Sequence, residues 1–361
     1  GIMKISSYIP VSVRISGSCL LAVCAAWTAV SCGKTDTPEQ PSDTGDCIAF
    51  YVSANNTIGT KAAIDDTESL LAMSQVPSIH VTDQEQNTAF GVNKEIIYSD
   101  NGVWRSDKEW VSGRSYQFYA YIASPDSGYG APVSVSDNGR NVTVTQPEKY
   151  SDNNDHWSDY FLSYITNADG DTRGLVSLDF ERVTTCVELY VSTPNSETVT
   201  IKNVGFTNVN RSATFRITKH ANSGDAVSGQ MNNSWAVTPG SSRTSYSVSD
   251  VVVKQFSAEQ DFDYNTDYRV MYFLTVPQET HVEEPGKEFD IYLNMTYTVK
   301  ESDTSTPEYT VKLPLNNYRP AMWEMGHKIR YYVSIDTSVE LTGTVSAWKT
   351  VDFIEGTLLP D

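Results

Sequence analysis

From Cys47 onward, apolar and polar residues alternate in short runs that end at clusters of Gly, Asn, Asp, Ser and Pro. Because successive side chains of a β-strand point to opposite faces, this period of two predicts strands rather than helices. Val, Thr and Tyr, which favour strands, are frequent in these runs. The clearest predicted strands are Ile48–Val52, Ser115–Ile122, Asn141–Thr145, Val187–Val191, Val270–Val276, Glu288–Val299, Tyr309–Leu313 and Lys328–Ile335.

Turn signals separate the predicted strands. Asp-Asn-Gly occurs at 100–102 and at 137–139, and both copies predict tight turns. Aromatic residues occupy both faces of Tyr116–Tyr121, which predicts a central strand of a sandwich. Only Asp65–Ser74 has mild helical character, and we expect a short helix or turn there. Many short strands at this spacing predict an all-β protein built from β-sandwiches.

The chain has 361 residues, a length that suits two domains. The polar, glycine-containing segment Asn167–Gly174 separates the predicted strand Tyr160–Ile165 from the predicted strand Leu175–Phe180. We therefore expect an N-terminal β-sandwich domain over residues 47–172 and a C-terminal β-sandwich domain over residues 173–361.

The N-terminal segment has the features of a signal for export from the cell. Lys4 and Arg14 supply a basic start, and Cys19–Val30 is an apolar run. The run is shorter than the roughly 20 apolar residues that a membrane-spanning helix needs, but it fits the hydrophobic region of a signal peptide. We therefore expect residues 1–31 to be a signal peptide.

Cys32 ends the sequence Ala29-Val30-Ser31-Cys32, which resembles the lipobox of bacterial lipoproteins. The resemblance implies lipid on Cys32 and anchoring at the outer membrane, on the cell surface. The alternative is an ordinary signal peptide with an incidental cysteine. Residues 32–46 are polar after the cysteine, and we expect a flexible tether between the lipid and the folded body.

The net charge disfavours one class of partner, and the cysteines leave two alternatives open. The formal net charge is −19, which disfavours binding to the phosphates of nucleic acid. Beyond Cys32, the chain carries Cys47 and Cys186. These two residues either form a disulfide in an oxidising compartment or remain free thiols.

The sequence holds no recognisable catalytic or metal-binding motif. It lacks the HExxH zinc motif, the Walker A loop and the GxSxG nucleophile motif, and its histidines stand singly. The acidic stretches Asp152–Asp159 and Asn167–Asp171 offer oxygen ligands that suit Ca²⁺, but neither has the spacing of a calcium-binding loop. We therefore expect no catalytic residue, no metal and no cofactor.

Aromatic residues leave a second hypothesis open. Trp104, Trp110 and Trp157 are candidates for an exposed platform that stacks sugars, which would make the chain a surface glycan-binding lipoprotein. The alternative is that they fill sandwich cores. A third hypothesis, a hydrolase, requires two carboxylates that converge in a cleft.

Short segments in a fixed order resemble the fimbrillin-like proteins of Bacteroidales, the subunits and accessory proteins of type V pili. The resemblance runs along nearly the whole predicted mature chain. The segments that carry it are Ile48–Tyr51, Gly59–Ala62, Val103-Trp104, Tyr116–Tyr121, Asp159–Leu162, Val176–Cys186, Trp323–Tyr331 and Gly343–Trp348. Phe180 is followed by Glu181, where the family often has His.

The resemblance implies two tandem transthyretin-like, Greek-key β-sandwich domains in a non-enzymatic pilus protein. It also implies proteolysis after a basic residue in an early loop, loss of the first strand, and its replacement by a strand of a neighbouring subunit. On this chain the matching cut lies between Lys61 and Ala62. The alternative is that Lys61 is an ordinary surface lysine in a protein that is never cut, as anchor subunits are not.

Two further expectations follow from this hypothesis. Ile48–Val52 should be a replaceable edge strand, since an edge strand detaches most easily, and a central strand paired on both sides would count against assembly by its removal. The short segment after Trp348 offers one strand at most, which favours a tip or accessory protein over a stalk subunit. The expected partners are other pilus subunits, the outer membrane through Cys32, and host or bacterial surface ligands.

Overall fold

The structure is a computed structural model. It describes residues 46–54, 78–83, 90–100, 103–123, 133–152, 157–193, 198–217, 235–255, 268–282, 289–300, 304–315, 322–335 and 339–347. Cys32, Lys61, Ala62 and the expected helical segment Asp65–Ser74 lie outside these residues.

The all-β expectation is confirmed. The described residues form strands and no α-helix, and they are arranged in several sheets. Asn141–Thr145 is a strand with the predicted bounds, and Ser115–Ala123 extends the predicted strand by one residue. The alternation of apolar and polar residues was therefore a reliable guide to where strands form.

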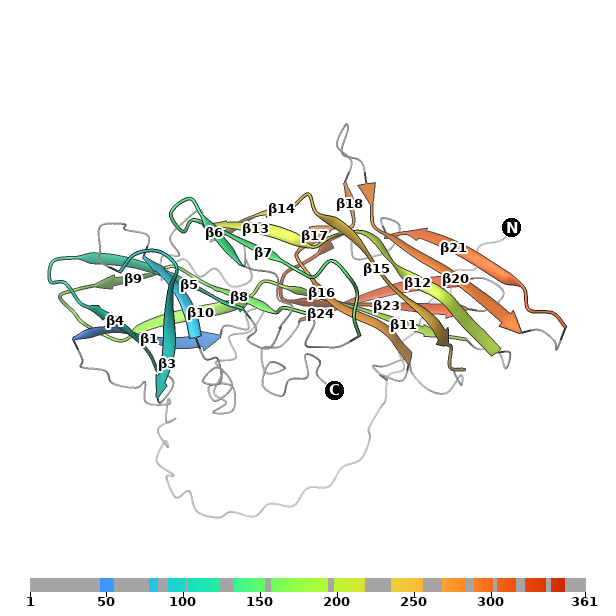
Figure 1. Ribbon diagram of the computed structural model, residues 1–361, viewed down its shortest axis with the longest axis horizontal. Coiled ribbons are helices and arrows are strands. Elements are labelled where there is room, and N and C mark those ends of the chain that lie inside the picture. The colour runs from blue at the N-terminus through green and yellow to red at the C-terminus, as the bar shows by residue number, and fades with distance from the viewer. Residues whose placement is uncertain are drawn as a thin grey trace, which may run out of the picture. The chain divides into compact units, whose positions relative to one another are not determined.

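The largest sheet closes on itself (Figure 1). Its strand order is β2-β3-β4-β1-β10-β8-β5-β9, and β2 also pairs with β5, so seven strands form a ring and β9 pairs with β5 beside it. The strands are β1 (Cys47–Ala54), β2 (Ser78–Asp83), β3 (Lys94–Asp100), β4 (Val103–Glu109), β5 (Ser115–Ala123), β8 (Tyr160–Ser163), β9 (Thr166–Asp169) and β10 (Val176–Arg182).

The interior of this ring is apolar. Alternate residues of each strand point inward and form one buried cluster, which includes Phe50, Trp104, Phe118 and Phe180. The residues between them point outward: Tyr119 and Tyr121 belong to a different buried cluster. The period of two in the sequence thus sorts the side chains of one sheet into two cores.

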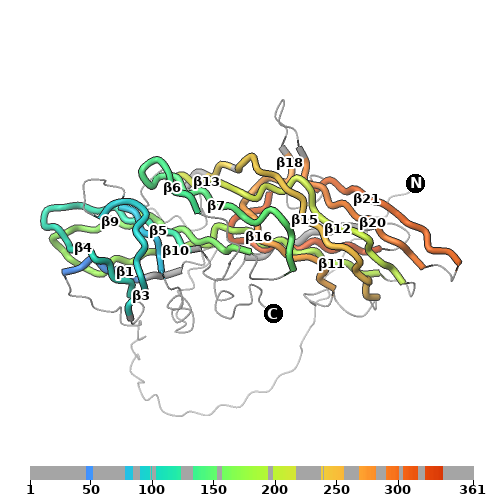
Figure 2. Tube along the Cα trace, in the orientation of Figure 1, coloured from blue at the N-terminus to red at the C-terminus, as the bar shows by residue number. Residues whose placement is uncertain are grey.

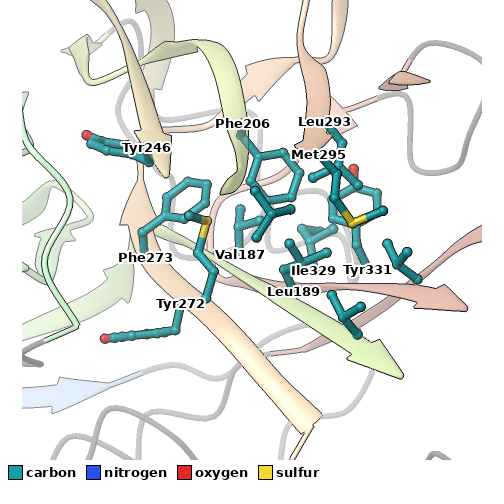
Figure 3. Close-up of a cluster of buried hydrophobic side chains, with 14 of the residues drawn as sticks. Val187, Leu189, Phe206, Tyr246, Tyr272, Phe273, Leu293, Met295, Ile329 and Tyr331 are labelled. Atoms are coloured by element: carbon teal, nitrogen blue, oxygen red, sulfur yellow. The ribbon is translucent and has the colours of Figure 1, made fainter. Parts of the chain in front are cut away.

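Two four-stranded sheets pack face to face in the second half of the chain. One contains β16 (Arg269–Thr275), β11 (Thr185–Ser192), β23 (His327–Ile335) and β24 (Val339–Ala347). The other contains β15 (Arg243–Val252), β12 (Thr198–Asn210), β20 (Tyr292–Lys300) and β21 (Glu308–Pro314). Their shared core, shown in Figure 3, joins Val187, Leu189 and Ile329 of the first sheet to Phe206 and Leu293 of the second.

A third four-stranded sheet contains strands from both halves of the chain. Its order is β14 (Trp235–Pro239), β13 (Ser212–Ile217), β7 (Asn141–Thr145) and β6 (Ser134–Ser136). Val142 and Phe215 of this sheet share a buried cluster with Tyr119 and Leu162, which belong to the closed ring. Two short pairs complete the described strands: β17 (Gln278–Glu279) with β22 (Met322–Trp323), and β18 (His281–Val282) with β19 (Phe289–Asp290).

Strands that lie on opposite sides of the predicted boundary between residues 172 and 173 pair with each other. β10 follows that boundary in sequence, yet it pairs with β1 and β8, which precede it. β7 likewise precedes it and pairs with β13. The polar segment that suggested a linker is a turn between β9 and β10, in which Thr172 N–H donates to Asp169 O and Arg173 adopts a positive φ of 45°.

Candidate functional site around the first strand

β1 is an internal strand of the closed ring, so the expectation of an edge strand was wrong (Figure 2). On one side it pairs antiparallel with β4, with Phe50 opposite Trp104. On the other side it pairs parallel with β10, with Phe50 opposite Val176. The reason is the parallel partner: β10 lies far along the chain, and local sequence contains no signal for that pairing.

The inward side chains of β1 are part of the ring core. Ile48 and Phe50 are both 0% exposed. The Phe50 ring makes edge contacts with Phe90 and Phe118, at centroid distances of 5.8 and 5.1 Å. Burying a side chain of this size contributes about 1.5–3 kcal/mol, and edge-to-face aromatic pairs add about 0.5–1.5 kcal/mol. β1 therefore belongs to the core as much as the strands beside it.

The outward side chains of β1 are smaller or half-buried. Ala49 is 2% exposed, whereas Tyr51 is half-buried and Cys47 is exposed. Burial, and secondarily the carboxylate of Asp179, raises the pKa of Tyr51 above its ordinary value. The Tyr51 hydroxyl is therefore neutral at neutral pH. On this outward face of β1, the fully enclosed position is that of Ala49.

Backbone groups near the start of β1 are held by specific contacts. The β1–β4 register shifts between Cys47 and Ala49. The buried hydroxyl of Ser106, on β4, donates to Ile48 O at 2.8 Å. Trp110 N–H donates to Asp46 O at 2.9 Å, and the exposed guanidinium of Arg173 lies 3.0 Å from the Asp46 carboxylate. Ser106 thereby supports the backbone where the strand ladder is irregular.

A buried carboxyl group lies on β10, the parallel partner of β1. Glu181 is 5% exposed and accepts a hydrogen bond from the hydroxyl of Tyr164. Burial raises the pKa of Glu181 to about 7, and the hydrogen bond from Tyr164 opposes this shift. Glu181 therefore keeps its proton to a higher pH in the folded chain than an exposed glutamate does.

This carboxyl group predicts a pH dependence of stability. Because the pKa is about 7 in the folded chain and 4.5 in its ordinary state, the stabilisation is complete below about pH 4.5 and is lost as pH rises through about 7. The expected loss of unfolding free energy is up to about 3 kcal/mol. Urea unfolding of the wild type and of Glu181→Gln, at about pH 5 and about pH 8, measures it. Equal pH dependence in the two proteins would contradict the assignment.

The tryptophans considered as a sugar platform are buried. Trp104, Trp110 and Trp157 all belong to hydrophobic cores, and the indole N–H of Trp157 donates to Ser151 O. Trp110 packs edge-on against Tyr116 at 5.2 Å. These three residues therefore do not form an exposed stacking surface.

The acidic stretches considered for calcium have structural partners. Asp159 is fully buried and accepts hydrogen bonds from Arg182 Nε at 2.9 Å and from the Thr184 hydroxyl. Asp171 accepts from the Ser112 hydroxyl and from Gly113 N–H, so it holds the turn between β4 and β5. Among the described residues, no group of three His, Cys, Asp or Glu side chains is placed to hold a metal ion.

The two cysteines of the folded body are both free thiols: Cys47 is exposed and Cys186 is buried. Within the described part of the chain, no helix is long and apolar enough to cross a membrane.

Lys61, Ala62 and Cys32, the predicted processing and lipidation residues, lie outside the described residues. The site defined by geometry is therefore β1 and its two partner strands, together with Ser106, which has no signature in the sequence.

These features define an all-β protein, in which the first strand is an integral, doubly paired part of a closed ring. The fimbrillin-like family matches residues 44–348, and the chain belongs to that family. It is accordingly a non-enzymatic structural protein of the fimbrial type, located at the cell surface.

Solved structures similar to this chain come from species of Bacteroides and Parabacteroides. A fimbrial protein from Bacteroides vulgatus is 14% identical, with a TM-score of 0.50, over 83% of this chain and 99% of its own. A protein assigned to cell adhesion from Bacteroides uniformis is 15% identical, with a TM-score of 0.45, over 86% and 100% of the two chains. A fimbrial assembly protein from Parabacteroides distasonis is 11% identical, with a TM-score of 0.36, over 83% and 96%. No curated protein matches this chain.

Proposed function

We propose that this chain is a fimbrial subunit or accessory protein that assembles by exchanging β1 for a strand of a neighbouring subunit. In this proposal residues 1–31 direct export, lipid on Cys32 anchors the precursor at the outer membrane, and residues 32–46 are the tether. The partners are other fimbrial subunits. The proposal rests on membership of the fimbrillin-like family and on the position of β1 between β4 and β10.

The position of β1 is the observation that carries the proposal. Removing β1 would leave two rows of unpaired backbone donors and acceptors above an apolar floor, one on β4 opposite residues 47–51 and one on β10 opposite residues 50–54. Such a gap favours an extended segment that pairs with both rows and refills the core. A replacement strand at an edge would recover only one row.

The same position sets a condition on the mechanism. An internal strand does not leave by fraying, because two ladders and the buried Ile48 and Phe50 hold it. Loss of β1 therefore has to be coupled to entry of the new strand, after β1 has been cut from the body. A cut between Lys61 and Ala62 would separate β1, together with Cys32, from the remaining strands.

The mature N-terminus tests this proposal. Mass spectrometry of the protein shed from the surface of cells that make it is expected to find chains that begin at Ala62. A Lys61→Gln variant is expected to keep the lipid-modified N-terminus at Cys32 and to remain attached to the cells. Shed wild-type chains that all begin at Cys32 would contradict processing at this site.

A further inference from the structure

We infer that the gap between β4 and β10 selects the incoming strand by an apolar–small–apolar triad of side chains and by its direction, while Ser106 binds its backbone without regard to sequence. This inference rests on the proposed exchange of β1 and identifies the chemistry of the segment that replaces it. The partner is an extended peptide segment with a large apolar residue, a small residue and an aromatic residue at consecutive positions.

The side chains of β1 define the triad. Ile48 and Phe50 point into the ring and are completely buried, and Phe50 contacts two other phenylalanine rings. A polar or small residue in place of Phe50 would leave a cavity beside Phe90 and Phe118. Because the inward positions are two residues apart, they impose the alternation of a strand on whatever fills the gap.

The small residue between them follows from Ala49. This residue faces away from the ring interior and is nevertheless 2% exposed. A larger side chain at this position has to displace the groups that enclose the alanine methyl, which costs stability in a packed environment. The next outward residue, Tyr51, is half-buried, so that position accepts a wider range of side chains.

The Ser106 hydroxyl supplies a contact that every incoming strand can make. It donates to the carbonyl of Ile48 at 2.8 Å, and it accepts from Lys108 N–H at 3.2 Å. The Lys108 N–H thus holds the hydroxyl oxygen in place, and the single proton has two acceptors in reach, Ile48 O in the gap at 2.8 Å and Lys108 O at 3.3 Å, of which the one in the gap is closer. Since its acceptor is a main-chain carbonyl, this bond contributes affinity and register but no side-chain selectivity.

The direction of the strand is set by its unlike neighbours. β1 runs antiparallel to β4 and parallel to β10. A strand that enters in the opposite direction would have to reverse both ladders, whose hydrogen-bond patterns differ. The gap therefore selects the chain direction of the incoming strand as well as its side chains.

Peptide exchange tests the inference on the full chain. A recognition sequence for a site-specific protease replaces residues 59–64, so that β1 can be cut from the body without cleavage elsewhere. The cut protein is then incubated with biotinylated peptides of residues 47–54 in which Cys47 is serine. Streptavidin capture after gel filtration measures how much peptide enters and how fast it leaves.

The peptides form a matched set. The parent peptide is expected to enter, and versions with Phe50→Ala or Ala49→Leu are expected to dissociate at least about tenfold faster. The reversed sequence is expected to be excluded, and a Tyr51→Ser version is expected to stay within about threefold of the parent. Ser106→Ala in the body is expected to weaken retention of every peptide by the same factor, about fivefold.

The outcomes separate the inference from the proposed function. If the parent, the Ala49→Leu and the Phe50→Ala peptides all enter and leave equally, exchange stands and the selectivity is overturned. If the Ser106→Ala effect depends on peptide sequence, the role of the hydroxyl is overturned. If even the parent peptide never enters the cut protein, exchange of β1 fails, and the inference fails with it.

Discussion

Replacing Phe50 with alanine is expected to lower the free energy of unfolding by about 3–5 kcal/mol, the range for large-to-small changes of a buried aromatic residue. Phe50 is completely buried, and its ring lies against Phe90 and Phe118. Truncation removes these contacts and leaves a cavity in the apolar core of the closed ring. Urea unfolding followed by fluorescence measures the change.

A control on an exposed strand position separates this effect from a general response to truncation. Val252, at the end of β15, is 65% exposed, and its replacement by alanine is expected to change stability by less than about 0.5 kcal/mol. If Phe50→Ala were as mild as Val252→Ala, β1 would not be part of the core. The account of an integral first strand would then be wrong.

Strand positions were predictable because alternation is a local property. Lys328–Ile335 was expected as a strand, and β23 adds only His327 at its start. Glu288–Val299 was expected as one strand, but the structure divides it into β19 and β20. Ile291 lies between them and donates its backbone N–H to Thr280 O instead of continuing the ladder. A long-range hydrogen bond of this kind leaves no trace in local alternation.

Strand neighbours were not predictable from alternation alone. The pattern states which residues of β1 point inward, but it is silent on which strand lies beside it. β1 pairs in parallel with β10, which places Phe50 opposite Val176. This second pairing makes β1 an internal strand instead of an edge strand. Composition alone was likewise insufficient at residue 172, where strands pair across the predicted boundary, because a polar turn and a polar linker have the same composition.

The candidate site was predictable in part. Ile48 and Phe50 stand out as the apolar positions of an early strand, and the fimbrillin-like resemblance singled out this segment. Ser106 could not be found in this way, since a serine in a strand is common and its role depends on the carbonyl of Ile48, which is 58 positions away along the chain. For the tryptophans the sequence left two alternatives, a surface platform or a place in the sandwich cores, and the fold buries them.

A reversible lock on β1 tests the central claim most directly. Ala49 and Arg105 lie opposite each other in the antiparallel β1–β4 pair, at a separation where cysteines at directly opposed positions approach disulfide geometry. In a Cys47→Ser background, Ala49→Cys with Arg105→Cys is expected to form a bond that holds β1 in the ring. A chain with Arg105→Cys alone controls for the loss of the arginine.

Growth of fibres from the purified, processed chain is the measurement, followed by electron microscopy before and after reduction. The account predicts that the oxidised double-cysteine chain remains monomeric, that reduction restores growth, and that the single-cysteine control grows in both conditions. Fibres that form at the control rate while the bond is closed would contradict the claim that β1 gives up its place to a neighbouring strand.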